Sequence, residues 1–354
     1  MILVSPTRKA ALLALTAAAT LGACGTIKPE VELPSQTSAQ LRAESQFEQE
    51  GLLNRLREQD QRVAGIAFRI TTANVALCED KGPQTGLVLQ SALQYGPRLR
   101  ASAERVFGID ARPSVQAVVP ASPAARAGLR VGDVILAVDG QGLSVSAVDK
   151  GPQTYAPVEA VLASLNRALV RGSVGLTIAR AGAVSTVDLG SDQGCAFDAQ
   201  VIPSREVNAS ADGAHVFVTT GLLRYANDDA DLAVVLGHEF AHDVMHHRRR
   251  LDSKGFARNV LGELGSTSQS LNTAEREADY VGLYLTARAG YDISRAADFW
   301  RRFAADYGDS AYARWSHPGS PERAAALAAT RDEILQKLRS GQPLTPNPAR
   351  LPSA

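Results

Sequence analysis

Two histidines and a glutamate stand together in residues 234–247, V-V-L-G-H-E-F-A-H-D-V-M-H-H. His238 and His242 are four residues apart, so they share one helix face at the spacing that lets two imidazoles bind one zinc ion. Glu239 follows the first histidine, where its carboxylate could reach a metal-bound water. The alternative is a helix with ordinary histidines, but the chain has only six. The spacing therefore predicts a zinc site with Glu239 as general base.

A catalytic zinc ion usually takes a third protein ligand. The positions three and six residues past His242 hold Met245 and Arg248, which excludes the longer motif with a glycine and a third histidine there. His246 would require three successive turns to converge on one ion, so its expected role is a charge at the helix C-terminus. Another source of a ligand must lie downstream.

Residues 273–283 are T-A-E-R-E-A-D-Y-V-G-L. They read as the capped start of a helix, on which Glu275 and Asp279 are four apart and face the same way. Glu277 lies off that face, and we expect it to be solvated. His215 belongs to no motif and is expected at the surface.

The zinc histidines need a rigid helix to hold them. Residues 230–247 carry apolar side chains at helical spacing, acidic residues before them and basic residues at their end, which complements a helix dipole. Residues 39–62 also have a helical pattern, whereas 63–70 and 85–90 are predicted as strands. Residues 251–272 join the two site helices and could form a mobile lid or a membrane-facing loop.

H-E-x-x-H followed by E-x-E-A-D-x-x-G-L resembles the HtpX/BepA-like zinc metallopeptidases, family forty-eight of the metallopeptidases. Residues 213–223, 231–237 and 316–327 are similar to further parts of that family. The resemblance implies that His238, His242 and Glu275 hold one Zn²⁺ ion and that Glu239 is general base and acid. It also implies that residues 216–218 form the edge strand on which a substrate lies.

Three further roles follow from the same resemblance. Asp279 would orient a zinc histidine, as carboxylates commonly do. His317 would approach the zinc and block or regulate it, although it could equally be an ordinary loop histidine. Arg323 would steady the loop of His317.

Residues 115–140 carry a second functional signal. They predict a strand, a short helix that stops at Gly128, a turn and another strand. This run resembles the PDZ domains of bacterial proteases, which implies binding of an extended peptide by strand addition. Phe107, Gly108 and Ile109 resemble the loop whose backbone N–H groups face the peptide carboxylate. The alternative is a unit that only packs against its neighbour.

The first residues resemble an export signal. Arg8 and Lys9 precede an uncharged run over residues 10–23, which is shorter than the roughly 20 residues of a membrane-spanning helix. Leu-Gly-Ala-Cys at 21–24 resembles the lipobox of bacterial lipoproteins, which implies cleavage before Cys24 and its lipidation. A plain signal peptide is the alternative. Gly25 follows Cys24, where an aspartate would retain a lipoprotein at the inner membrane of enteric bacteria. The outer membrane is therefore the favoured location.

Export would place the remaining cysteines, Cys78 and Cys195, in an oxidising compartment. Neither belongs to a C-x-x-C motif, so a disulfide is favoured over two free thiols. The formal net charge of zero gives no basis for binding nucleic acid.

We therefore expect an α+β protein: a mainly helical zincin-type metalloprotease domain with a small edge-strand sheet, plus a PDZ domain built as a short β-barrel with two helices. The expected segments are a signal peptide (1–23), a lipidated tether (24–39), the N-terminal helix and strands of the catalytic body (40–98), the PDZ domain (99–192), the zinc metallopeptidase domain (193–340) and a disordered tail (341–354).

The expected function is zinc-dependent endopeptidase of the bacterial envelope, acting on misfolded or unassembled periplasmic and outer-membrane proteins. Expected partners are protein or peptide substrates, the membrane through the lipid on Cys24, and outer-membrane assembly machinery. The alternative is a non-catalytic or latent PDZ lipoprotein, an assembly chaperone or scaffold whose metal site His317 gates. Retention of Glu239 argues against a purely structural metal, which needs no base.

Overall fold

The computed structural model describes residues 36–144, 151–253, 265–312 and 321–347. Cys24, His317 and residues 254–264 of the expected lid lie outside these ranges. The chain divides into two compact units, residues 1–44 and 45–354. Within the described residues of the first unit lies only the start of helix α1, and the rest of the fold belongs to the second. No helix in the described ranges is long and apolar enough to cross a membrane.

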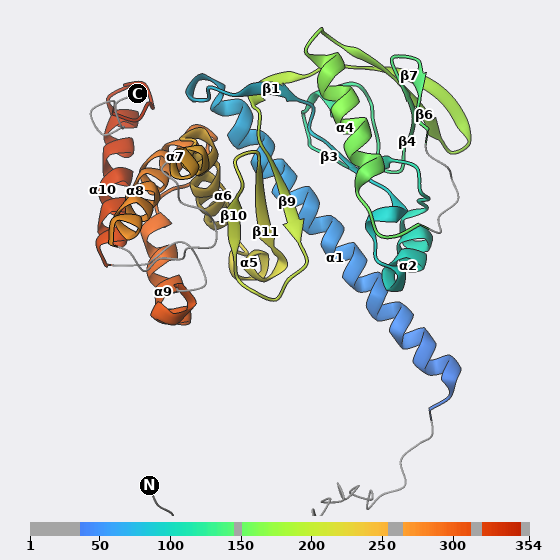
Figure 1. Cartoon of the computed structure of the whole chain (residues 1–354), viewed down its shortest axis with the longest axis horizontal. Coiled ribbons are helices and arrows are strands. Elements are labelled where there is room, and N and C mark those ends of the chain that lie inside the picture. The colour runs from blue at the N-terminus through green and yellow to red at the C-terminus, as the bar shows by residue number, and fades with distance from the viewer. Residues whose placement is uncertain (1–35, 145–150, 254–264, 313–320, 348–354) are drawn as a thin grey trace, which may run out of the picture. The chain divides into compact units, whose positions relative to one another are not determined.

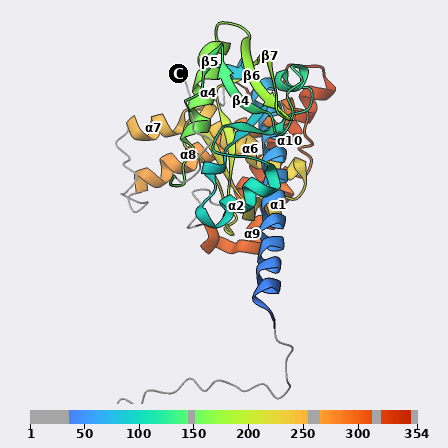
Figure 2. The same ribbon diagram turned by 90° about the vertical axis from the view of Figure 1, so that its right-hand side faces the viewer.

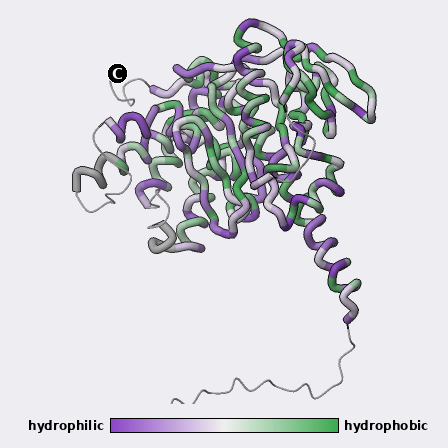
Figure 3. Tube along the Cα trace, turned by 45° about the vertical axis from the view of Figure 1, so that its right-hand side comes forward, coloured by the Kyte–Doolittle hydropathy of each residue, from purple (hydrophilic) through white to green (hydrophobic). Residues whose placement is uncertain are grey.

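Helix α1 (Ser38–Ala73) is the long blue helix in both ribbon views (Figure 1 and Figure 2). Its first turns are exposed and mainly polar (Figure 3). The strand predicted at 63–70 is wrong, because these residues continue α1. Val63, Ile66 and Ile70 are buried on one helical stripe. Their β-branched side chains favour a strand locally, but the spacing of three and four residues lets a helix bury all of them.

The PDZ sheet contains β2 (Leu87–Gln90), β3 (Ser114–Val118), β4 (Val134–Val138), β6 (Val174–Arg180) and β7 (Ala183–Leu189), antiparallel and in that spatial order. The short β5 (Gln141–Gly142) pairs with β4. The strand predicted at 85–90 is therefore present, as are the two strands predicted within 115–140. The sheet is open and not the expected barrel. Since β2 is one of its strands, this domain begins before residue 99.

Helices flank this sheet. They are α2 (Pro97–Phe107), α3 (Pro123–Arg126) and α4 (Ala156–Leu169), with a 3-10 turn η2 (Ala92–Gln94) before α2. Apolar residues of α4 pack with those of the strands in one core. Helix α4 therefore covers the sheet.

Strand β1 (Lys81–Gln84) pairs antiparallel with β8 (Asp192–Cys195), so the chain enters and leaves the PDZ domain at adjacent points. A 3-10 turn, η1 (Val75–Leu77), joins α1 to this ribbon. The structure bonds Cys78 to Cys195 in a disulfide with a Cα–Cα distance of 5.5 Å. Both cysteines are buried in the main core of the catalytic part.

The catalytic part begins with a three-stranded sheet of β9 (Asp198–Ile202), β10 (Ala209–Ala211) and β11 (His215–Thr219). Its order is β10-β11-β9. The prediction that residues 216–218 form an edge strand is wrong, because β11 is central, antiparallel to β10 and parallel to β9. The edge strand beside helix α6 is β10 (Figure 1).

Helices complete this part: α5 (Thr220–Tyr225), α6 (Asp229–Val244), α7 (His247–Ser253), α8 (Gly265–Arg288), α9 (Ala296–Tyr312) and α10 (Pro321–Arg339). The expected disordered tail is ordered over its described residues. The Leu344 carbonyl accepts a bond from Arg288 at 3.1 Å, and the Asn347 N–H donates to the Tyr280 hydroxyl at 2.9 Å.

Helices α6 and α8 cross in close contact at two glycines. A Cβ on Gly237 would lie 2.6 Å from the Gly282 carbonyl oxygen, and one on Gly282 would lie 2.7 Å from the His238 Cα. Both distances are shorter than real Cβ atoms make to non-bonded atoms. Glycine at both positions therefore sets the distance between the helix that carries the histidines and the helix that carries Glu275.

We expect Gly282→Ala to lower the free energy of unfolding by about 3 kcal/mol, since the methyl group overpacks a backbone contact. It should also weaken metal binding by moving α8 away from α6. Denaturant unfolding and metal titration measure the two effects. The control is Gly65→Ala in α1, where a Cβ meets nothing within 4 Å; helix propensity there should add up to about 1 kcal/mol. Equal stability of Gly282→Ala and wild type would contradict this account.

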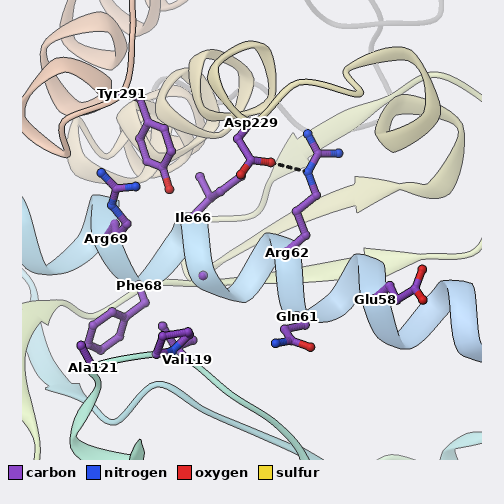
Figure 4. Close-up of a pocket in the computed structure, with 12 residues that line it drawn as sticks. Glu58, Gln61, Arg62, Ile66, Phe68, Arg69, Val119, Ala121, Asp229 and Tyr291 are labelled. Carbon is purple, nitrogen blue, oxygen red and sulfur yellow. Dashed lines mark hydrogen bonds and ion pairs between the residues drawn. The ribbon is translucent and has the colours of Figure 1, made fainter.

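Helix α1 joins the two domains through polar contacts. Arg62 Nε donates to Asp229 Oδ1 at 2.6 Å, in the first turn of α6. A groove of about 680 Å³ lies along this side of α1, and Val119, Ala121 and Tyr291 are among the residues that line it (Figure 4). Its lining includes neither of the zinc-site histidines nor Glu275, so it is separate from the predicted metal site.

On the PDZ side, Asp60 of α1 accepts a hydrogen bond from Gln116 of β3. Burial raises the pKa of Asp60 to about 6, although the bond from Gln116 and the charge of Arg57 act against the shift. Because the folded state holds this proton more tightly than the unfolded chain, stability falls as the pH rises from about 4 to 6 and is flat above.

We expect Asp60→Asn to remove that decline and to raise the free energy of unfolding at pH 8 by about 2 kcal/mol. The amide fills the same space without a buried charge. Denaturant unfolding at several pH values measures this, with the exposed Asp188→Asn as control. Lower stability of Asp60→Asn than of wild type at pH 8 would contradict the expectation.

Candidate metal centre

Three predicted ligands meet in the structure. The Nε2 atoms of His238 and His242 lie 3.2 Å apart. The Glu275 carboxylate lies 3.4 Å from the first of them and 3.6 Å from the second. One ligand atom from each residue can be chosen so that all lie within 4.8 Å of one another. Two imidazoles and one carboxylate form a donor set of catalytic zinc sites.

The fold explains this convergence. Residues four apart on α6 stack on the same face, and the glycine crossing brings α8 against that face. Glu239 follows His238 on α6 and is only 1% exposed. A carboxylate kept this far from solvent beside the ligands suits a proton-transfer role better than a surface role.

Asp279 and Arg323 orient His238. Asp279 Oδ1 lies 2.9 Å from His238 Nδ1. Arg323 binds both oxygens of Asp279 at 2.7 Å, and its guanidinium stacks 3.6 Å from the centre of the Trp300 ring. Burial would raise the pKa of Asp279, but the charge of Arg323 and the bond to His238 hold it below its usual value. Arg323 therefore holds the carboxylate behind the histidine, a role that differs from the predicted support of the His317 loop.

The same contacts govern protonation of His238. Burial acts to lower its pKa, but hydrogen bonds to Asp279 and Glu275 outweigh burial and raise it to about 9. A metal ion at Nε2 must replace that proton, so metal affinity should increase with pH.

A buried histidine and a half-buried glutamate whose contacts the sequence did not reveal lie behind His242. His247 is 2% exposed, and its Nδ1 lies 2.8 Å from His242 Nδ1. Its Nε2 lies 2.9 Å from Glu277 Oε2. The prediction of a solvated Glu277 is wrong, because His247 and Arg250 enclose it. Five residues apart, His242 and His247 would not face each other on one continuous helix.

The remaining predicted residues lie away from the cluster. His246 pairs with Glu79 at 2.9 Å, and His215 with Asp198 at 2.8 Å. The hydrogen bond to Asp198 raises the pKa of His215. Both histidines thus have acidic partners outside the metal centre.

The predicted PDZ loop also lies elsewhere. Gly108 is the left-handed C-cap of α2, and its N–H donates to the Glu104 carbonyl. Phe107 lies 3.5 Å beneath the Arg57 guanidinium, and Ile109 is buried in a small core. Since the Gly108 N–H is used by the helix, this segment does not form the predicted carboxylate-binding loop. Its glycine has a conformational purpose, which is to end α2.

Comparison with protein-family models assigns these parts. Residues 178–265 and 266–331 match the model of peptidase family M48, and residues 114–151 match a PDZ domain. Residues 178–331 of this chain thus resemble the M48 peptidases. The M48 match contains all three converging ligands, Glu239, and the residues that orient the histidines.

Curated relatives match about a third of this chain. Mitochondrial metalloendopeptidase OMA1 of Bos taurus is 32% identical over 151 residues, which cover 34% of this chain and 28% of that protein. The OMA1 protein of Arabidopsis thaliana is 30% identical over 158 residues, 38% of this chain and 32% of that protein. The putative beta-barrel assembly-enhancing protease of Vibrio cholerae is 28% identical over 136 residues, 30% of this chain and 28% of that protein. The chain spans about a third or less of the length of these relatives.

Proposed function

We propose that the protein is a zinc-dependent endopeptidase in which His238, His242 and Glu275 hold the ion and Glu239 is the general base. One observation carries the proposal: two imidazole nitrogens and a carboxylate converge in a buried site, with a second buried carboxylate adjacent in sequence. A structural zinc site would be closed by four protein ligands and would not need that second carboxylate.

The protein residues divide the chemistry. A bound zinc ion would polarise the scissile carbonyl and lower the pKa of an attacking water. Glu239 takes the proton from the water and delivers it to the leaving amine. Asp279 keeps the proton of His238 on Nδ1, so that Nε2 presents a lone pair to the ion.

Substrate would lie along β10. This strand lies beside α6, and within the described residues its other edge pairs with no strand. An extended peptide can add to such an edge through backbone hydrogen bonds, with little sequence preference. The exposed Ser210 marks the middle of that edge.

The PDZ domain would present a second peptide site at β2. This strand is the first of its sheet, and Gly86 just before it adopts a positive φ of 67°. Strand β2 thus replaces residues 107–109 as the candidate peptide-binding element. Binding of unfolded chain ends there would supply substrate to the peptidase.

We further propose that the protein acts at the bacterial envelope on misfolded or unassembled periplasmic and outer-membrane proteins. The lipobox-like sequence ending at Cys24 supports anchoring at the periplasmic side of a membrane, with the outer membrane favoured. The name of the Vibrio relative supports a connection with outer-membrane assembly machinery.

Metal removal tests the enzymatic proposal. We expect the purified full chain to contain about one zinc ion and to cleave casein, to lose cleavage on chelation, and to regain it with added zinc. Zinc analysis and gel-based cleavage measure both properties. A chain that binds zinc without cleaving casein or any other unfolded protein would overturn the proposal and favour the scaffold.

A further inference from the structure

The two histidines of the metal centre are oriented by different means. His238 contacts a carboxylate directly, through Asp279. On its Nδ1 side His242 contacts another histidine, and that histidine in turn contacts the carboxylate of Glu277. We propose that Glu277 acts through His247 to fix the tautomer of His242, so that both are positioning residues for the metal. This inference rests on the proposed function of the same site.

The backbone creates this contact at one residue. Helix α6 ends at Val244, and α7 begins at His247. Between them His246 adopts a positive φ of 52°. The left-handed residue interrupts the helix, and His247 just after it contacts His242 in the last turn of α6. The ring centres of His242 and His247 are then 4.8 Å apart, with the planes at 75°.

The direction of the hydrogen bonds follows from the final acceptor. An ionised carboxylate only accepts, so Glu277 requires the proton of neutral His247 to be on Nε2. His247 Nδ1 then carries a lone pair and accepts from His242 Nδ1–H. A neutral His242 with its proton on Nδ1 has its lone pair on Nε2, the atom that faces His238 and Glu275. The charge on Glu277 thus selects the metal-binding tautomer of His242 through two consecutive hydrogen bonds.

Glu277 is held in the state that this requires. Arg250 Nη1 donates to Glu277 Oε2 at 2.6 Å. The charge of this guanidinium favours the ionised carboxylate, which can then only accept hydrogen bonds.

Glu277→Gln tests the proposal with almost no change in shape. The amide can donate to His247 Nε2, which would move the proton of that ring to Nδ1 and reverse the bond to His242. We expect the zinc dissociation constant to rise about 10- to 100-fold, as for other residues that orient metal ligands. The absorption spectrum of the cobalt-substituted full chain should change too, a readout that a loss of stability alone would not produce. Glu277→Asp, which retains the charge, should recover part of the affinity.

His215→Asn is the control. It removes another histidine with an acidic partner, Asp198, and both of these residues lie outside the metal centre. Its zinc affinity and cobalt spectrum should equal those of wild type. Wild-type affinity and spectrum in Glu277→Gln would overturn the proposal.

A second measurement does not depend on any variant folding. Nitrogen-15 NMR of the zinc-loaded wild-type chain reports which nitrogen of each imidazole carries the proton. We expect the Nε2–H form for His247 and the Nδ1–H form for His242; a proton on His247 Nδ1 would overturn the proposal. These readouts need no proteolysis. Cleavage by wild type together with unchanged Glu277→Gln would reject only this inference, whereas zinc binding without cleavage would reject only the proposed function.

Discussion

Glu239→Gln should retain its zinc and lose hydrolysis by a factor of about 1,000 or more. The amide has nearly the same shape as the carboxylate, but it cannot take a proton from water, and general-base catalysis is typically worth about 10² to 10⁴ in rate. The three converging ligands are untouched, so metal content should stay at the wild-type level. Casein cleavage and zinc analysis on the same preparations measure both quantities.

The control for this change is Glu206→Gln. Glu206 is an exposed glutamate before β10, and its described hydrogen bonds are made by its backbone: the N–H donates to Ser204 Oγ, and the carbonyl accepts from Thr219 Oγ1. This variant should cleave at the wild-type rate. Full activity in Glu239→Gln would mean that another group accepts the proton, and the mechanism proposed above would then fail.

The second large effect concerns the disulfide. Cys78 and Cys195 are 117 residues apart, and the chain-entropy model assigns about 5 kcal/mol to closing a loop of that length. We expect the double variant Cys78→Ala/Cys195→Ala to lose about that much free energy of unfolding. Both cysteines are buried, so small side chains should fit without a new clash.

Denaturant unfolding of the wild type with and without reductant, beside the double variant, measures the effect. Reductant should lower the stability of the wild type towards that of the variant and leave the variant unchanged. A double variant as stable as the oxidised wild type would show that the unfolded chain gains little freedom from losing this bond.

The parts of the site that sequence could predict are those governed by local spacing. His238 and His242 share a face on any helix, and Glu275 and Asp279 share one on the next. Pairing those two faces required the family resemblance, because no local pattern states that α6 crosses α8. The PDZ strands were accessible for a similar reason: glycine turns and alternating apolar residues are short-range signals.

The errors arise where long-range structure decides. Residues 63–70 contain many β-branched side chains, yet packing along one helical stripe makes them part of α1. The role of Glu277 depends on His247, and that contact depends on the backbone angle of His246. A single positive φ at a residue other than glycine leaves no clear mark in a sequence.

The pairing of β1 with β8 makes the PDZ domain a removable cassette. Gln84 and Asp192 are cross-strand partners, so the whole segment between them departs from and rejoins a single ribbon. A two-residue turn is enough to connect two such partners in an antiparallel hairpin. Peptide capture and peptide cleavage can therefore be inherited, exchanged or engineered independently, since changing the cassette requires no new crossing in the peptidase.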